Sequence, residues 1–299
     1  MDYPNEKYLT KTFVQEFIKK KYEESAIWEN YTTKTPCDAL SVLWYQEAYI
    51  DIETVNDTAL SAPIDSKLKR PAFRAGGSLF ATTKYDTIEQ KNAALYQLAL
   101  QGSVTEEAVK YTSMLQPILR MQTKLANSMA SEVNRLIMNT MTENWTPSLT
   151  QTLTASTAWN NTANDSIVPD ILDAVEKIED LSGYNYKADM VGVSKQTYFD
   201  IRKWAALNDY ELSYENFRGE TKVPTIEGLK LVVSNHIKRD TAIVMDNKVA
   251  CTVFESQPVT TDTYFNKPTR EYNFQIMKTF YPALTDPKAI CTITNLDCS

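Results

Sequence analysis

One histidine and four cysteines are the residues of this chain best suited to act as metal ligands, nucleophiles or general bases. A single histidine cannot build a site that needs several imidazole ligands. His236 could act as a general base, but it follows an apolar run in a stretch typical of a turn, so we predict a structural role for it. The cysteines form no C-x-x-C pair, and a reducing compartment would keep them as inert thiols: Cys37, Cys251, Cys291 and Cys298.

Carboxylates could perform acid–base chemistry if a cleft held one of them beside a substrate. Asp51, Glu53 and Asp57 lie close together in the sequence, but without a cleft that raises one pKa such a cluster is usually a solvated edge. The seven glycines form no phosphate-cradling loop and no nucleophile elbow. We therefore predict no enzyme activity, no catalytic residue, no cofactor and no metal. An α/β hydrolase or transferase stays open as an alternative, which a concave pocket with perturbed carboxylates would support.

The composition is that of a globular protein, since 43% of the 299 residues are hydrophobic and 23% are charged. This length predicts one large domain or two closely joined domains. The net charge of −7 disfavours wrapping DNA through phosphate contacts, although it does not exclude lying beside DNA inside a container. No run of about 20 apolar residues occurs, and residues 1–21 lack the apolar core of a signal peptide. We therefore expect no membrane association and synthesis in a cytoplasm.

Two helices are predicted in the first half of the chain. Residues 6–24 carry an apolar stripe at helical spacing, which could close over the subunit's own core or dock on a neighbour: Leu9, Phe13, Val14, Phe17 and Ile18. Ser103 and Glu106 fit a capping box at the start of a longer helical segment. Pro117 interrupts that segment and kinks or restarts the helix, whose part up to about Met141 would be about 36 Å long.

A polar stretch without periodicity separates these helices. Residues 39–50 are rich in β-formers and predict a strand. Residues 51–78 contain two prolines and a cluster of cations made of Lys67, Lys69, Arg70 and Arg74. Two strand-like runs follow, at 78–85 and 93–100. Residues 51–100 thus predict a long hairpin with a loose tip, which would need a partner surface because an isolated hairpin is marginal in water.

The second half of the chain predicts an α/β region after a boundary at 142–166. Residues 168–181 and a segment capped by Ser194 read as helices, the second with Tyr198, Ile201, Trp204 and Leu207 facing inward. Asn208–Val223 reads as a charged loop. The predicted strands are 188–193, 226–233, 241–245, 249–254, 272–281 and 289–294.

The order of these elements resembles that of the Hong Kong 97-type major capsid proteins of tailed bacterial and archaeal double-stranded DNA viruses. Gly102–Ala108 resembles the entry to that family's long spine helix, and Val168–Ala174 its first axial-domain helix. Further segments match later elements of the family: Ala188–Ser194, Thr225–Ser234, Thr241–Asp246 and Asp286–Ile290. The similarity covers nearly the whole chain and is best from about residue 93 onward.

The resemblance implies an α+β subunit with four parts. These are an N-terminal arm at 1–50, an extended β-hairpin loop at 51–100, a peripheral domain with the spine helix and a β-sheet at 101–145 and 250–299, and an axial α/β domain at 146–249. Asn208–Val223 would face the centre of the capsomer. Candidate contacts between subunits are Phe13, Phe17, Lys67, Lys69, Arg70, Arg74, Tyr210 and Arg218.

The implied function is that of a major capsid protein that assembles itself into an icosahedral virion shell around double-stranded DNA. Its partners would be other copies in hexamers and pentamers, a portal protein and, where the virus uses them, scaffold or cement proteins. Assembly would take place in the host cytoplasm, without sequence-specific DNA binding and without a membrane. The alternative is a shell of the same fold that encloses cargo enzymes, like an encapsulin.

Overall fold

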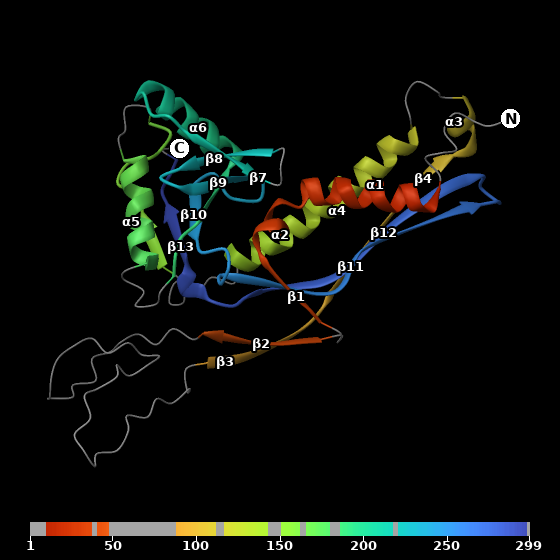
Figure 1. The fold of residues 1–299 in the computed structure, drawn as a ribbon, viewed down its shortest axis with the longest axis horizontal. Helices are drawn as coiled ribbons and strands as arrows, with labels where there is room; N and C mark the ends of the chain where they lie inside the picture. The colour runs from red at the N-terminus through yellow and green to blue at the C-terminus, as the bar shows by residue number, and fades with distance from the viewer. Residues whose placement is uncertain are drawn as a thin grey trace, which may run out of the picture. The chain divides into compact units, whose positions relative to one another are not determined.

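The computed structural model describes residues 10–37, 41–47, 88–111, 117–142, 151–161, 166–179, 186–217 and 221–297 (Figure 1). The chain forms two compact units. Unit 1 contains Met1–Leu43, Asn92–Asn144 and Cys251–Ala283, and unit 2 contains Trp44–Lys91, Trp145–Ala250 and Leu284–Ser299. Both helices and sheets are present, as the α+β prediction requires.

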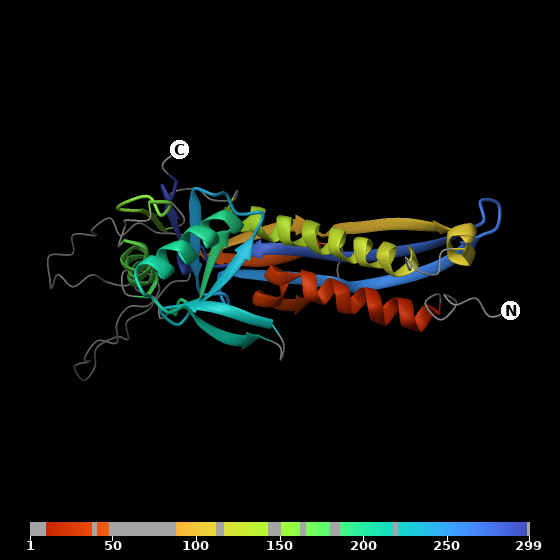
Figure 2. The same ribbon diagram turned by 90° about the horizontal axis from the view of Figure 1, so that it is seen from above.

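Unit 1 is built on a four-stranded sheet in the order β1-β11-β12-β4. These strands are β1 (Thr33–Pro36), β11 (Cys251–Asn266), β12 (Glu271–Leu284) and β4 (Tyr96–Thr105). β1 runs parallel to β11, and β12 runs antiparallel to β4. Four helices belong to the same unit: α1 (Lys11–Ser25), α2 (Ile27–Tyr31), α3 (Glu106–Tyr111) and α4 (Pro117–Thr142). Figures 1 and 2 show α1 and α4 lying side by side over one face of this sheet.

Alternation of side chains explains which face of the unit 1 sheet the helices cover. The even-numbered positions Phe274, Ile276, Lys278 and Phe280 of β12 are all buried, as expected for one face of a strand. Gly102 of β4 lies opposite Phe274, and a Cβ at Gly102 would come within 2.6 Å of the sulfur of Met121 in α4. This is therefore the face that α4 covers.

The helices of unit 1 confirm the predicted apolar stripes over their described residues. Val14, Ile18 and Tyr22 are the buried positions of α1. α4 begins at Pro117, so the proline restarts the helix rather than kinking it. The capping box at Ser103 is wrong, because Ser103 lies inside β4. The hydroxyl of Thr105 instead accepts a hydrogen bond from the Ala108 amide at 3.3 Å, at the start of the short helix α3.

The predicted long hairpin is described only at its base. β2 (Ser41–Glu47) pairs with β3 (Ile88–Ala94) in a two-stranded sheet, which confirms the strand predicted at 39–50. The predicted strand 93–100 is divided, because β3 ends at Ala94 and β4 begins at Tyr96. The predicted loop 51–78 and strand 78–85 lie outside the described residues.

Unit 2 is built on a seven-stranded sheet in the order β5-β13-β10-β6-β9-β8-β7. Its strands are β5 (Gln151–Thr154), β13 (Ile290–Thr294), β10 (Thr241–Met245), β6 (Met190–Ser194), β9 (Leu229–Ser234), β8 (Thr221–Ile226) and β7 (Ser213–Phe217). The helix α5 (Ile167–Glu179) packs on β5, β13 and β10, and α6 (Lys195–Leu207) packs on β6 and β9. Both helices share one apolar cluster with every second residue of the strands, so they cover the same face of the sheet.

Three details of unit 2 correct the sequence prediction. The predicted strand 226–233 is two strands, because Glu227 and Gly228 form a tight turn between β8 and β9 with positive φ at both residues. The predicted loop Asn208–Val223 contains β7 and the first part of β8, which pair antiparallel. Leu207, predicted to face inward, is 65% exposed at the end of α6.

The division into units also differs from the predicted domain ranges at the C-terminus. The prediction grouped residues 250–299 with 101–145, whereas Leu284–Ser299 belongs to unit 2. The reason is that β13 pairs with both β10 and β5 of the seven-stranded sheet. The names peripheral and axial domain stay predictions drawn from the resemblance.

Candidate functional site

The two predicted contact residues in α1 form a stacked aromatic pair. The rings of Phe13 and Phe17 have their centroids 5.7 Å apart at an interplanar angle of 13°. Both side chains are half-buried, whereas Val14 and Ile18 beside them are fully buried. The described part of the predicted N-terminal arm thus closes over its own unit, since α1 packs on α4 and β11. A contact of Phe13 and Phe17 with another subunit stays a prediction.

The remaining predicted contact residues fall into two groups. Tyr210 is half-buried in unit 2, where its ring lies 5.3 Å from that of Trp204 and its hydroxyl donates a hydrogen bond to Glu227 at 2.8 Å. Its described contacts therefore lie within the subunit. The others lie outside the described residues: Lys67, Lys69, Arg70, Arg74 and Arg218.

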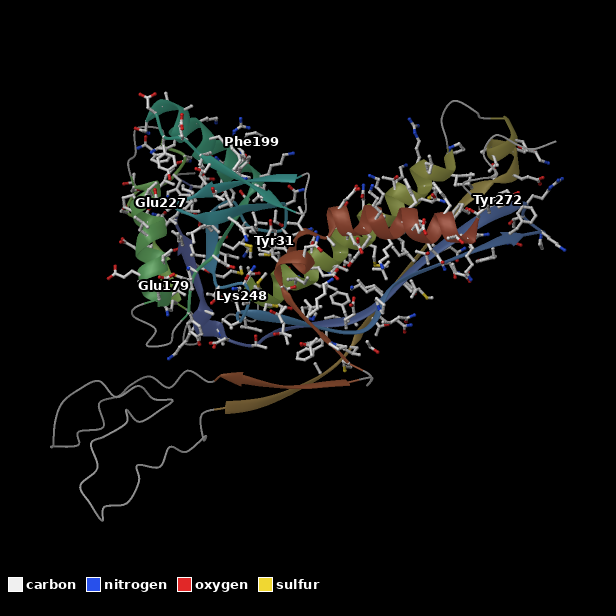
Figure 3. The ribbon with its side chains drawn as sticks, in the orientation of Figure 1. Tyr31, Glu179, Phe199, Glu227, Lys248 and Tyr272 are labelled. Atoms are coloured by element: carbon white, nitrogen blue, oxygen red, sulfur yellow. The ribbon has the colours of Figure 1, made fainter. Side chains whose placement is uncertain are left out.

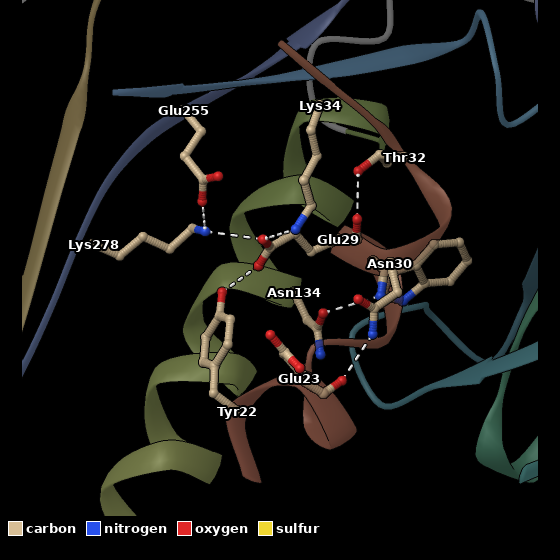
Figure 4. Close-up of polar contacts among 10 residues, drawn as sticks. Tyr22, Glu23, Glu29, Asn30, Thr32, Lys34, Asn134, Glu255 and Lys278 are labelled. Atoms are coloured by element: carbon tan, nitrogen blue, oxygen red, sulfur yellow. Dashed lines mark hydrogen bonds and ion pairs between the residues drawn. The ribbon is translucent and has the colours of Figure 1, made fainter. Parts of the chain in front are cut away.

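A buried cluster of charged side chains, which the sequence did not predict, lies in unit 1 (Figure 4). The ammonium group of Lys278 on β12 lies 2.9 Å from a carboxylate oxygen of Glu29 on α2, and both side chains are at most 2% exposed. Lys278 also pairs with Glu255 on β11. Lys34 on β1 reaches the same Glu29 oxygen at 2.5 Å, and the hydroxyl of Tyr22 on α1 donates a hydrogen bond to the other oxygen. Five elements of unit 1 thus meet at one point.

The cluster balances two carboxylates against two ammonium groups. Burial alone would raise the pKa of Glu29, but the charges of Lys278 and Lys34 and the hydrogen bonds to Glu29 outweigh it and lower that pKa. Burial, followed by the negative charge of Glu29, raises the pKa of Tyr22, so its hydroxyl stays a hydrogen-bond donor. The ammonium of Lys278 also lies 5.5 Å from the ring centroids of Tyr22 and Phe280.

A second polar contact holds the corner between α1 and α2 on the long helix. The side-chain oxygen of Asn134 in α4 accepts a hydrogen bond from the Trp28 amide at 3.1 Å, and its nitrogen donates to the Ser25 carbonyl at 2.9 Å. The hydroxyl of Ser25 donates to Asn127 of α4 at 2.8 Å. Hydrogen bonds as well as apolar packing therefore hold the corner between α1 and α2 on α4.

One sequence signal could have revealed the charge cluster. Lys278 occupies a position of β12 at which Phe274, Ile276 and Phe280 point inward, so a strict alternation predicts that the lysine is buried too. A buried lysine requires a carboxylate partner. The identity of that partner could not be predicted, because Glu29 lies 249 residues away in the sequence.

The arrangement of the described titratable groups offers no catalytic chemistry. No group of three or more potential metal ligands occurs among them. Burial raises the pKa of the Cys251 thiol to about 12 and that of Cys291 to about 12, which suits inert thiols rather than nucleophiles. Glu106 borders a hollow at the turn between β11 and β12, together with Lys110 and Arg270.

The Glu106 hollow does not support the hydrolase alternative. Hydrogen bonds from Lys110 and Arg270 lower the pKa of Glu106, whereas a general acid would need a raised pKa. The Arg270 side chain approaches the carboxylate to 2.7 Å, and Arg270 is itself exposed on the turn. This contact joins the β11–β12 turn to α3.

Among the described helices, none is long and apolar enough to cross a membrane.

A family model described as phage capsid protein matches residues 88–293, well over half of the chain. The chain belongs to the phage capsid protein family. Capsid proteins of this family build the shell and are not enzymes. No curated protein matches the chain by sequence.

Solved structures confirm the capsid fold at low sequence identity. The virus-like particle protein from Pyrococcus furiosus is 12% identical, with a TM-score of 0.58 over 94% of this chain and 97% of that one. The encapsulin SrpI from Synechococcus elongatus is 11% identical, with a TM-score of 0.56 over 91% and 88%. A structure from Mycobacterium phage Che8 is 11% identical, with a TM-score of 0.51 over 89% and 90%. The fold alone therefore does not separate a phage capsid from an encapsulin, and the family match makes that distinction.

Proposed function

We propose that copies of this capsid protein assemble into the icosahedral shell of a tailed virus and enclose its double-stranded DNA. The observation that carries the proposal is the capsid family match over residues 88–293, together with a fold in two units on separate sheets. The copies would form hexamers and pentamers. Curvature would arise from placing one chain in both kinds of ring.

The described structure supports a subunit that works by packing against copies of itself. The base of the predicted extended hairpin, β2 and β3, forms a sheet of only two strands, which is marginal in water without a covering surface. The contacts predicted for Phe13, Phe17, Tyr210 and Arg218 and for the cations at 67–74 belong to this proposal. So do the axial and peripheral roles of the two units.

The proposed partners beyond the chain itself follow from the family. A portal protein would occupy one vertex, and scaffold or cement proteins would assist where the virus encodes them. The net charge of −7 would limit adhesion to the packaged DNA, which the shell would enclose without reading its sequence. Assembly in the host cytoplasm would precede DNA entry.

Expression of the chain followed by electron microscopy tests the proposal. We expect closed shells, formed by the chain alone or after co-expression with a scaffold protein from the same genome. Subunits that stay monomeric under all assembly conditions, with and without scaffold, would contradict it. The encapsulin alternative predicts a cargo enzyme inside particles purified from the natural source, and the capsid proposal predicts double-stranded DNA there.

A further inference from the structure

Two helices of unit 2 expose faces of opposite charge. The sequence of α5 carries four carboxylates and one lysine, and that of α6 carries three cations and one carboxylate. The outward side of α5 presents Leu172, 46% exposed, with Asp173 and Glu176. The outward side of α6 presents Phe199, also 46% exposed (Figure 3).

Each exposed apolar side chain has charges near it, and these are mostly of one sign. Residues three and four positions apart are neighbours on a helix surface. Phe199 therefore has the exposed cations Lys195, Arg202 and Lys203 around it. Leu172 has Glu176 one turn further on, and Asp173 lies three positions before Glu176. Asp200, which follows Phe199, is less exposed and pairs with Lys203. An apolar centre with a charged rim is the usual composition of a protein interface.

These charges are largely unused within the subunit. Among the described residues, Asp173, Glu176 and Lys195 form no ion pair. Arg202 lies 5.9 Å from the ring centroid of Tyr198, and Lys203 pairs with Asp200 at 3.3 Å with 65% of its side chain exposed. Glu179 differs, because its carboxylate accepts a hydrogen bond from the Ala188 amide at 3.1 Å. We therefore define the acidic face as Leu172, Asp173 and Glu176, and the basic face as Lys195, Phe199, Arg202 and Lys203.

The position of the two helices favours a contact between two copies of the subunit through these faces. α5 and α6 cover different strands on one face of the sheet and direct their inner residues into a shared core. Their outer faces are therefore not available to each other. Two different, complementary patches on one molecule can join it to a second copy of the same molecule.

We propose that the acidic face of α5 in one copy docks against the basic face of α6 in the next copy, with Leu172 packing near Phe199. This inference rests on the proposed shell function and names one of its contacts. Charge complementarity would steer the two faces together, and the apolar pair would exclude water at the centre. A basic face alone would also suit DNA, but it would not explain the matching acidic face on the same unit.

Charge reversal tests the contact. One variant carries Lys195→Glu and Arg202→Glu, a second carries Asp173→Lys and Glu176→Lys, and a third carries all four substitutions. We expect either reversal alone to raise the subunit concentration needed for shell formation at least about tenfold, and the combination to restore it to within about threefold of wild type. Light scattering and negative-stain electron microscopy measure assembly.

Matched controls keep the sign of each charge. Lys195→Arg with Arg202→Lys, and Asp173→Glu with Glu176→Asp, should assemble as the wild type does. Phe199→Ala and Leu172→Ala should each impair assembly without changing the charge. Thermal unfolding of unassembled subunits verifies that every variant is folded.

The outcomes separate this contact from the shell function. Normal assembly of the single reversals, or failure of the combined variant to recover while its subunits stay folded, would overturn the contact and leave the shell function intact. A reversal of α6 that acts alone and lowers only the DNA retained per particle would assign the basic face to DNA instead. If the wild type forms no shells, sedimentation of wild-type and variant subunits still measures pairwise association. Association that charge reversal leaves unchanged would then refute the contact.

Discussion

Each unit of the subunit buries a carboxylate in its core, but the two are stabilised in different ways. Glu29 in unit 1 is 1% exposed and accepts contacts from the ammonium groups of Lys278 and Lys34. Asp170 in unit 2 is 3% exposed, and the hydrogen bonds that it accepts from described residues come from neutral groups. These are the indole of Trp159 at 2.9 Å and the amide and hydroxyl of Ser156 at 3.2 and 3.0 Å.

The two carboxylates also differ in the length of chain that they connect. The partners of Asp170 lie 11 and 14 residues away, and Asp170 stands in the first turn of α5, where the helix dipole favours a negative charge. Lys278 lies 249 residues from Glu29. Asp170 thus orders a local turn of unit 2, whereas Glu29 joins segments of unit 1 that lie far apart in the sequence. The stability of unit 1 should therefore be more sensitive to loss of one charged partner.

The largest effect is expected from Lys278→Met. The substitution leaves the buried Glu29 and the half-buried Glu255 near each other without Lys278, and removing one partner of a buried ion pair costs about 3–5 kcal/mol. Urea unfolding of unassembled subunits measures the loss. The matched control is Lys203→Met, because the Lys203–Asp200 pair is exposed and such a pair contributes at most about 1 kcal/mol. If both variants lost equally little unfolding free energy, the charge cluster of unit 1 would contribute no more to stability than an exposed ion pair of unit 2.

A double variant tests whether the charge cluster of unit 1 adds to the unfolding free energy when compared with uncharged side chains at the same positions. Combining Lys278→Met with Glu29→Gln removes both charges of the most deeply buried pair, and replacing a buried pair by uncharged groups is often neutral or better. We expect the double variant to recover part of the stability that Lys278→Met loses. A double variant less stable than Lys278→Met would show that Glu29 contributes independently of its partner.

The next effect is expected from Asp170→Ala in unit 2. The substitution leaves the buried indole N–H of Trp159 and the donors of Ser156 without an acceptor, which costs about 1–3 kcal/mol. Asp173→Ala, three residues further along the same helix and exposed, should change the unfolding free energy by less than about 0.5 kcal/mol. A loss at Asp170 as large as that at Lys278 would mean that neutral and ionic partners hold a buried carboxylate equally.

Acid should weaken unit 1 through the protonation of Glu29. Glu29 has a pKa in the folded subunit below its ordinary value of 4.5. Its contribution is therefore fully present above about pH 4.5 and is lost as the pH falls through the lowered folded value. The measurement is the unfolding free energy of unassembled subunits from pH 7 to pH 3. Glu29→Gln should have a shallower decline below pH 4.5 than the wild type, and parallel curves would contradict the role of Glu29.

Local patterns in the sequence were sufficient for the parts of the fold that local interactions determine. The apolar stripes predicted α1, α4, α5 and α6, and the cap at Ser194 is confirmed by its hydrogen bond. The turn at Glu227-Gly228 was missed because a glutamate at positive φ is not the asparagine or aspartate that marks such hairpins. Leu207 was misplaced because helical spacing alone does not show that the last turn of α6 extends beyond the core.

The candidate site was less predictable than the fold. Phe13 and Phe17 could be proposed from their spacing, but the charge cluster depends on strand register and on partners far apart in the sequence. The complementary faces of α5 and α6 also required the structure. Only burial shows that Leu172 and Phe199 point outward while Ile171 and Ile201, next to them in the apolar pattern, point inward.

The smallest effect is expected from Ser194→Ala, which tests the local character of unit 2 at a neutral contact. The hydroxyl of Ser194 accepts a hydrogen bond from the Thr197 amide at 3.1 Å at the start of α6, and losing such a cap costs about 1 kcal/mol. Ser213→Ala, at an exposed position of β7 in the same unit, is the matched control and should be nearly neutral. If Ser194→Ala costs as little as the control, then α6 is held by its apolar contacts alone. Unit 2 would then depend less on local polar contacts than its comparison with unit 1 implies.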